Sequence, residues 1–273
     1  MTTILSSSTI SNPELWRLSL LIRKGSVDVL ARRIIVGDND DRAITASLPY
    51  ISDATNESFK ELFFSNPLLF ERFGKVDVLL SRGFSVLQPL DSTISHIDTL
   101  FPQSVDSNLW HTLSDDIDSH TKIIFRAERS ILNFIRRTFP GITPRHELSV
   151  LSKYFLHQSR LGNSHRVYVN ICDNYLNVVI TDNKGVCMAS SFNFSNIDDA
   201  AYYVLASAST AGFNFSNDEI RVSGDSARRA LLMPVLRRFA RHVMPDIFPS
   251  SAIGDDSSVI SSPLSLVVIP LCE

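Results

Sequence analysis

Five segments in the second half of the chain decide the fold: VYVNICD (167–173), YLNVVITD (175–182), VCMASSFNF (186–194), IDDAAYYVLASA (197–208) and IRVSGDS (220–226). The first three carry apolar residues at strand spacing and are joined by polar turns, which predicts three antiparallel strands. Asp182-Asn183-Lys184-Gly185 is typical of a hairpin turn. The fourth segment has apolar residues at helical spacing, with Asn196 or Asp198 as a cap before it and Gly212 after it. The last segment predicts a strand that ends in the turn Ser223-Gly224-Asp225-Ser226.

The same layout occurs earlier in the chain. Residues 16–33 hold two alternating strand segments around Lys24-Gly25-Ser26, and we expect a third strand within 43–48. A helix capped by Asn56 or Ser58 follows, and 75–81 and 84–89 then predict two more strands. The order of elements repeats although the sequence does not. We therefore expect two similar α/β halves that close on a cleft.

Residues 90–161 are expected to form a smaller α+β unit, with a short helix at 94–100, two strands, and a helix at 128–138 that buries Ile131, Leu132 and Ile135. The predicted divisions of the chain are a flexible arm at 1–13, a first half at 14–162 that includes this unit, and a second half at 163–273. The boundary is expected at Gly162-Asn163-Ser164.

The end of the chain predicts a helix and a strand. The helix begins near Ser226 and is expected to be kinked or split by Pro234. Its predicted buried positions are Ala227, Leu231, Val235 and Phe239. Its predicted outward positions are Arg228, Arg229, Arg237, Arg238 and Arg241. The run LSLVVIPL (264–271) predicts the last strand.

Composition narrows the class of protein. The chain has 273 residues, 44% of them hydrophobic and 20% charged, which is typical of a globular protein. A net charge of -3 disfavours nucleic acid as the main partner. No apolar run approaches the roughly 20 residues that a membrane helix needs, and the N-terminus does not resemble a signal peptide, so we expect a cytoplasmic protein. The chain has three cysteines, Cys172, Cys187 and Cys272, and no CxxC motif. We expect all three to be reduced, buried thiols.

Several motifs together resemble a known family. They are KVDVLLSRGFSVLQP (75–89), IIFRAERSILNFIRRTFPG (123–141), RHELSVL (145–151), SSFNFSNIDDAAYYVLAS (190–207), IRVSGD (220–225) and LCE (271–273). In this order they are similar to a family of uncharacterised proteins from Bacteroides-like bacteria, over nearly the whole chain from Leu15 to Glu273. The resemblance implies an α/β actin-like ATPase (ribonuclease H-like) duplicated fold of two lobes. Residues 90–161 then look like the subdomain of cell-division and pilus-assembly relatives, which bind ATP or an assembly partner.

That superfamily binds nucleotide at three turns, and the resemblance implies where they would lie here. The candidate nucleotide-binding residues are Lys24, Gly25, Asp173, Ser223, Gly224 and Asp225. No Asp precedes the first turn, the second turn has no glycine, and the third retains one glycine of its set. We therefore assign no catalytic residue, no metal ligand and no cofactor; the alternative is ATP with Mg²⁺ in the cleft.

Other patterns have simpler interpretations. Gly224-Asp225-Ser226 could present a nucleophilic serine, but His242 is the only histidine after it and no acidic partner stands three residues before that histidine. Asp38, Asp40 and Asp41 resemble a calcium loop that lacks its glycine and its last carboxylate. The arginines of 228–241 are by default a solvated helix face; the alternative is a binding site for an acidic partner.

Three functional hypotheses follow. The first is a protein-binding adaptor or assembly component that has the actin-like fold and no catalysis. The second is a divergent ATPase or kinase that uses the cleft. The third is a sensor that closes its two lobes on a small anion without chemistry.

Overall fold

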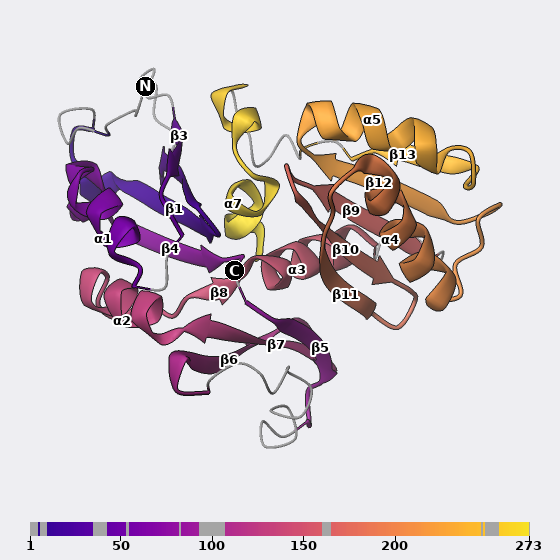
Figure 1. Ribbon diagram of the computed structural model, residues 1–273, viewed down its shortest axis with the longest axis horizontal. Helices are drawn as coiled ribbons and strands as arrows, with labels where there is room; N and C mark the ends of the chain where they lie inside the picture. The colour runs from indigo at the N-terminus through magenta and orange to yellow at the C-terminus, as the bar shows by residue number, and fades with distance from the viewer. Residues whose placement is uncertain are drawn as a thin grey trace.

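The computed structural model describes residues 5, 10–34, 43–52, 55–81, 83–92, 107–159, 165–246, 248 and 257–272. Two five-stranded sheets in this part of the chain have the same strand order (Figure 1). The first sheet runs β3 (Ile44–Pro49), β2 (Ser26–Arg33), β1 (Trp16–Arg23), β4 (Lys75–Leu80), β8 (Arg145–His146). The second runs β11 (Val186–Asn193), β10 (Tyr175–Thr181), β9 (Arg166–Ile171), β12 (Glu219–Gly224), β13 (His242–Pro245). The two halves therefore repeat one topology.

Strand directions repeat as well as strand order. In each sheet the first three strands are antiparallel, and the last two run parallel to the central strand, β1 or β9. Parallel neighbours need a crossover, and a helix supplies it in both halves. In the first half α1 (Glu57–Phe64) lies between β3 and β4, and in the second α4 (Ile197–Thr210) lies between β11 and β12. The predicted duplication is confirmed.

A third sheet is inserted between β4 and β8. Its order is β5 (Ser85–Pro89), β7 (Thr121–Glu128), β6 (Trp110–Asp116), and all its strands are antiparallel. The sheet thus includes β5, which pairs with β7 and not with the first sheet. The helix predicted at 94–100 lies outside the described residues. The next helix, α2 (Arg129–Thr138), buries Ile131, Leu132 and Ile135 as predicted.

The two large sheets face each other across two helices. In Figure 1, α1 and α2 cover the far side of the first sheet, α4 and α5 (Ser226–Leu236) cover the far side of the second, and α3 (Glu147–Ser159) and α7 (Leu264–Val268) lie between them. Alternation along the strands explains this arrangement. Val167, Val169 and Ile171 of β9 join the core under α4 and α5, whereas Tyr168 joins the core of the first sheet, α3 and α7. Tyr168 stacks on Phe155 of α3, with ring centroids 4.4 Å apart.

The predicted last strand is wrong. Residues 264–268 form α7, and a 3-10 helix, η7 (Ile269–Cys272), follows. All five α7 residues are buried, and a short apolar run of this kind has no periodicity that separates a strand from a helix. The helix packs in the core of the first sheet, where Arg32 donates a hydrogen bond to the Val267 carbonyl at 3.1 Å. The end of the chain thus returns to the first half.

The predicted burial around α5 is wrong at Ala227, Leu231 and Phe239, which are exposed, whereas Val235 packs against the core as predicted. The helix buries Leu232, Met233 and Leu236, while Leu231 and Phe239 are more than half exposed. The segment carries two apolar faces, and the one formed by Leu232, Met233 and Leu236 packs on the second sheet, while Phe239 lies beyond the end of α5 at Leu236. Pro234 lies in the last turn of α5, so the helix is not split there but ends two residues later.

Asn56 precedes α1 as predicted, but its side chain does not cap the helix; it donates to Glu128 and Ser130 at the start of α2. Leu5 and Ile10, within the expected arm, are buried. Short 3-10 helices are η2 (Pro13–Leu15), η3 (Pro67–Phe70), η5 (Ser107–Leu109) and η6 (Ser257–Ser261). The expected boundary at Gly162-Asn163-Ser164 lies outside the described residues.

Two further observations concern the described residues alone. All three cysteines are free thiols, but only Cys172 is buried; Cys187 is exposed and Cys272 is half-buried, which corrects the expectation for those two. In the part of the chain that the structure describes, no helix has the length and hydropathy needed to span a membrane.

Candidate functional site

The first of the three turns joins β1 to β2. Lys24 is exposed at its tip, and Gly25 adopts a φ of 89°, which favours glycine. The strand before the turn ends in Arg23, whose Nε lies 2.7 Å from Oδ2 of Asp28 on β2. The ion pair between Arg23 and Asp28 therefore occupies the end of β1, beside the first turn.

The second and third turns lie side by side because β9 and β12 are parallel neighbours. Gly224 pairs with Ile171, and the Asp225 N–H donates to the Ile171 carbonyl at 2.8 Å. A Cβ on Gly224 would lie 2.0 Å from that carbonyl oxygen, and the φ of Gly224 is 96°. Only glycine fits such a close approach of two backbones, so the packing of the second sheet accounts for Gly224.

Ser223 and Asp225 are each hydrogen-bonded within the second half. Ser223 is buried and its hydroxyl donates to the Val169 carbonyl at 3.0 Å. The Asp225 carboxylate accepts the Arg228 N–H at 2.8 Å and caps the N-terminus of α5. A cap of this kind satisfies one of the free N–H groups that would otherwise attract an anion. Asp173, in the second turn, is exposed.

Glu147 links the three parts of the protein that meet here. It is 1% exposed and begins α3, where the helix dipole favours a carboxylate. It accepts a hydrogen bond from the Tyr175 hydroxyl on β10 at 2.9 Å and from the Ser265 hydroxyl on α7 at 3.1 Å. The Arg23 guanidinium lies 5.8 Å from the centre of the Tyr175 ring, close enough for a cation–π contact. We call Arg23, Asp28, Glu147, Tyr175 and Ser265 the Glu147 cluster.

Burial dominates the protonation of the groups around this cluster. It raises the pKa of the Cys172 thiol to about 12, and the Glu147 charge adds to the rise. Burial also raises the pKa of the Tyr175 hydroxyl well above its ordinary value. Burial raises the pKa of Asp28, an effect that Arg23 opposes. Because a thiolate is needed for nucleophilic attack, Cys172 is unsuited to covalent chemistry near neutral pH.

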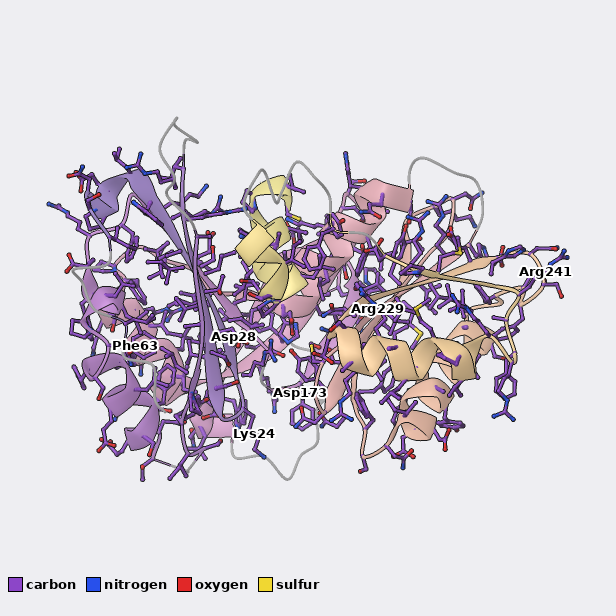
Figure 2. All side chains as sticks on the ribbon, turned by 90° about the horizontal axis from the view of Figure 1, so that it is seen from above. Lys24, Asp28, Phe63, Asp173, Arg229 and Arg241 are labelled. Atoms are coloured by element: carbon purple, nitrogen blue, oxygen red, sulfur yellow. The ribbon has the colours of Figure 1, made fainter. Side chains whose placement is uncertain are left out.

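The sequence-predicted residues thus converge on the boundary between the sheets. Figure 2 shows Lys24 and Asp173 there, with Asp28 close by on β2. Asp28 and Asp173 also interact electrostatically, since Asp173 contributes to the raised pKa of Asp28. Whether Lys24, Gly25, Asp173, Ser223, Gly224 and Asp225 bind a nucleotide stays a prediction.

Sequence reasoning missed the Glu147 cluster. Asp28 and Glu147 do leave a signal, because each is a single carboxylate within an apolar run, SVDVL (26–30) and HELSVL (146–151). Such a pattern indicates a buried acid that needs a partner. It does not identify Tyr175 or Ser265, which come from other parts of the chain.

The serine-nucleophile alternative does not survive the geometry. His242 pairs with Glu219, at the opposite end of β12 from Gly224. Five residues of strand separate the two positions, or roughly 16 Å at ~3.3 Å per residue, far beyond hydrogen-bond reach of Ser226. The calcium-loop candidates Asp38, Asp40 and Asp41 lie outside the described residues. Within the part of the chain that the structure describes, no group of three or more His, Cys, Asp or Glu is placed to bind a metal ion.

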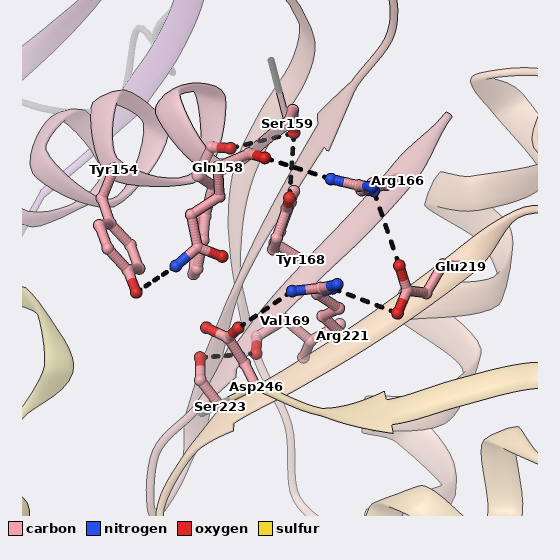
Figure 3. A network of polar contacts seen from close by, with 11 residues as sticks. Tyr154, Gln158, Ser159, Arg166, Tyr168, Val169, Glu219, Arg221, Ser223 and Asp246 are labelled. Carbon is pink, nitrogen blue, oxygen red and sulfur yellow. Dashed lines mark hydrogen bonds and ion pairs between the residues drawn. The ribbon is translucent and has the colours of Figure 1, made fainter. Parts of the chain in front are cut away.

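A second charged network crosses the inner side of the second sheet (Figure 3). Arg166 and Arg221 flank Glu219, with Nε to carboxylate distances of 3.6 and 3.2 Å, and Arg221 reaches Asp246 at 4.0 Å. Arg166 also donates to the Gln158 carbonyl of α3 at 3.2 Å. Burial raises the pKa of Asp246 to about 6, Arg221 opposes the rise and Glu219 adds to it. The network ties α3 to the second sheet.

Comparison with known proteins identifies the family. Residues 17–243 match the family described as "Protein of unknown function (DUF3822)". The chain belongs to the DUF3822 family. This result confirms the resemblance to a family of uncharacterised proteins. A search of curated proteins finds no match.

Solved structures agree on the fold of this DUF3822 member. A Bacteroides thetaiotaomicron protein with actin-like ATPase fold and unknown function is 19% identical, with a TM-score of 0.74 over 86% of this chain and 91% of that chain. A structure of the PilM-PilN type IV pilus biogenesis complex is 12% identical, with a TM-score of 0.58 over 96% of this chain and 100% of that chain. The protein has the actin-like ATPase fold, as expected.

Proposed function

We propose that this DUF3822 protein is a cytoplasmic adaptor or assembly component that binds another protein and does not hydrolyse nucleotide. The observation that carries this proposal is the Arg23–Asp28 ion pair at the end of β1. A guanidinium there repels a metal ion, whereas Mg²⁺ at a nucleotide is held by carboxylates and phosphate oxygens. The first turn therefore does not fit a magnesium phosphate.

The other two turns support the same proposal. At the third turn, the space beside Gly224 is filled by the Ile171 carbonyl, and Asp225 places its own carboxylate at the start of α5. A phosphate would have to displace that carboxylate or approach a like charge. At the second turn, Asp173 offers a carboxylate but no glycine whose backbone could cradle an anion.

The Glu147 cluster supports a scaffold role. Nucleotide in a two-lobed protein stabilises closure by bridging the lobes, and here the protein's own side chains make the bridge. The Glu147 carboxylate contacts Tyr175 of the second sheet and Ser265 of α7, and Arg23 of the first sheet lies against the Tyr175 ring. A fixed arrangement of lobes presents a preorganised surface, which favours binding of a partner. PilM, a structural neighbour, was solved in a complex with PilN, which is consistent with this role.

Titration with Mg-ATP tests the proposal. A ligand present at a hundredfold excess over its Kd stabilises a protein by about 2.7 kcal/mol. We expect no change in Tm with millimolar ATP, ADP or GTP in the presence of Mg²⁺, and no phosphate release. A clear upward shift with turnover would overturn the proposal in favour of a divergent ATPase or kinase, and a shift without turnover in favour of an anion sensor.

Any shift must then be assigned to a site. Substitution of Gly224 is unsuitable, because a side chain there would disrupt the sheet. Lys24→Ala is suitable because the side chain is exposed, and Lys184→Ala, in the exposed turn between β10 and β11, is its matched control. Loss of the shift in Lys24→Ala alone would place the nucleotide at the first turn. The protein-binding part of the proposal predicts a stoichiometric partner in purifications from the native host, and its repeated absence would count against it.

A further inference from the structure

The exposed face of α5 and the loop after it carry features that neither the fold nor the Glu147 cluster explains. We propose that this surface docks an acidic segment of a partner protein that also carries an apolar side chain as an anchor. The inference rests on the proposed adaptor function and adds to it the place and the chemistry of binding. We call Ala227, Leu231, Pro234, Arg238, Phe239 and Arg241 the α5 surface.

The apolar part of this surface follows from the phase of the helix. Because α5 packs on the second sheet through Leu232, Met233 and Leu236, its opposite face carries Ala227, Leu231 and Pro234 at i, i+4 and i+7. Leu231 is 56% exposed and Phe239 is 57% exposed. A surface helix normally turns polar residues to solvent, so an apolar outer face is unusual. Figure 1 shows α5 at the outside of the second half, with no helix or strand beyond it.

The charges on the same surface have one sign. Arg228, Arg238 and Arg241 form no ion pair with a carboxylate among the described residues; in the second half, such pairs involve Arg166 and Arg221. The Arg238 guanidinium lies 5.8 Å from the centre of the Phe239 ring, close enough for a cation–π contact. Arg237 donates to the Val243 carbonyl at 3.2 Å, which fixes the loop that carries Arg238 and Arg241.

Charge complementarity identifies the occupant. Exposed arginines recognise carboxylates with two parallel hydrogen bonds, and they are enriched among the residues that dominate protein interfaces. An acidic segment would neutralise the arginines, and an apolar side chain on it would cover Leu231 and Pro234. Phe239 could stack on a base, but the net charge of the chain, -3, disfavours nucleic acid as the main partner. Two large exposed apolar side chains also bury too little area to anchor the protein in a membrane.

Selection from a random peptide library tests this inference, because acidic, basic and apolar sequences then compete for the same protein. Displayed 16-residue peptides are selected on the purified full-length protein, and the enriched peptides are synthesised with a fluorescent label. We expect enrichment of Asp and Glu together with at least one Leu or Phe. We expect the double variant Arg238→Glu/Arg241→Glu to weaken binding by about tenfold or more, since opposed charges become like charges.

Matched variants on α2 distinguish binding at the α5 surface from a general effect of net charge on peptide binding. Arg136→Glu/Arg137→Glu makes the same charge change at exposed positions of α2, and Leu109→Ala removes an apolar side chain that is 62% exposed. Neither should alter peptide binding, whereas Leu231→Ala should weaken it several-fold. Circular dichroism and Tm verify that each variant is folded. The peptide affinity should also fall as salt is raised.

Four outcomes would overturn the inference, and the last of them separates it from the adaptor function. The first is enrichment of peptides that are not acidic, or of none at all. The second is equal loss of binding in the α2 and α5 double variants. The third is binding of a 30-nucleotide single strand or of phosphatidylserine vesicles through the same arginines, without any peptide. Peptides that bind regardless of the α5 substitutions would overturn this inference and leave the adaptor function standing, whereas a nucleotide shift with turnover would overturn that function alone.

Discussion

The two large sheets share their topology but carry oppositely arranged charges at equivalent positions. In the first sheet, Asp77 on β4 pairs with Ser19 on β1, two residues after Arg17. In the second, Arg221 on β12 pairs with Tyr168 on β9, two residues after Arg166. At this equivalent position the first sheet carries the carboxylate of Asp77, which lies between two arginines. The second sheet carries Arg221, which lies between two carboxylates. One backbone scaffold accepts either sign because only the inward side chains change.

The first cluster (Arg17, Asp77 and Arg145) and the second cluster (Arg166, Glu219, Arg221 and Asp246) differ in how well their charges are matched. Asp77 lies 2.6 Å from the Arg17 Nε and 3.3 Å from the Arg145 guanidinium, so one buried carboxylate has two cationic partners. Among the described residues Asp246 makes an ion pair only with Arg221, at 4.0 Å; Arg229 is a weaker favourable charge, and Glu219 repels Asp246. In the first cluster, removal of Asp77 would therefore take away the carboxylate that two buried or half-buried arginines share. In the second cluster, Asp246 is the group that takes up a proton as the pH falls. Sequence alone places Asp77 and Arg221 on strands without revealing this contrast.

The largest effect on stability should come from substitution of Gly224, because the turn glycines of the two halves differ in how closely the backbone packs around them. Both Gly25 and Gly224 have φ near 90°, but a Cβ on Gly25 would meet only the Tyr50 carbonyl at 3.6 Å, whereas on Gly224 it would overlap the Ile171 carbonyl at 2.0 Å. Gly25→Ala should lower the free energy of unfolding by about 1–2 kcal/mol, the strain of a left-handed residue. Gly224→Ala adds a backbone clash and should lower it by about 5 kcal/mol or more, or prevent folding. Urea denaturation measures both, and equal effects would contradict the packing described for Gly224.

The next effect tests the charge comparison directly. Asp77→Asn removes the carboxylate charge that pairs with Arg17 and Arg145, and removal of one partner from a buried ion pair costs about 3–5 kcal/mol. Asp246→Asn should instead raise the free energy of unfolding at pH 7, by up to roughly 2–3 kcal/mol at 1.36 kcal/mol per pKa unit, because it removes a carboxylate that burial disfavours while Arg221 keeps Glu219. Both variants make the same chemical change, so each is the other's control. If Asp246→Asn destabilises as much as Asp77→Asn, the two clusters are equivalent in strength and the comparison is wrong.

Much of the fold could be predicted from the sequence, because periodicity and turns are local signals. The hairpin around Lys24-Gly25, the Asn196 cap of α4 and the repeated strand order all follow from residues that are close in sequence. Failures occurred where local signals were ambiguous. Residues 264–268 are apolar except for Ser265, and so short a run does not distinguish a strand from a helix; Pro234 predicted a kink or a split, but not that α5 ends two residues later.

The candidate site could be predicted only in part. Strand ends and turn glycines locate where the three turns meet, since the carboxyl ends of parallel strands lie at one edge of a sheet. The Glu147 cluster could not be found in this way, because it joins Arg23, Glu147, Tyr175 and Ser265 from four elements spread over most of the chain. Such contacts depend on how the halves pack, which no local pattern encodes.

The smallest effect is a pH dependence confined to the second cluster. The pKa of Asp246 is raised from 3.8 to about 6 in the folded protein, so the native state binds more protons than the unfolded state between these values. Its contribution therefore makes stability fall as pH rises from about 4 to 6, by roughly 2–3 kcal/mol at 1.36 kcal/mol per pKa unit. Burial lowers the pKa of His146 to about 4, which changes stability in the opposite direction, so the wild-type curve alone is not diagnostic. The informative quantity is the difference between wild type and Asp246→Asn, measured by urea denaturation from pH 4 to 8, because His146 is common to both. That difference should change between pH 4 and 6 and be constant above pH 7; parallel curves throughout would show that Asp246 is ionised normally and that the second cluster is as well matched as the first.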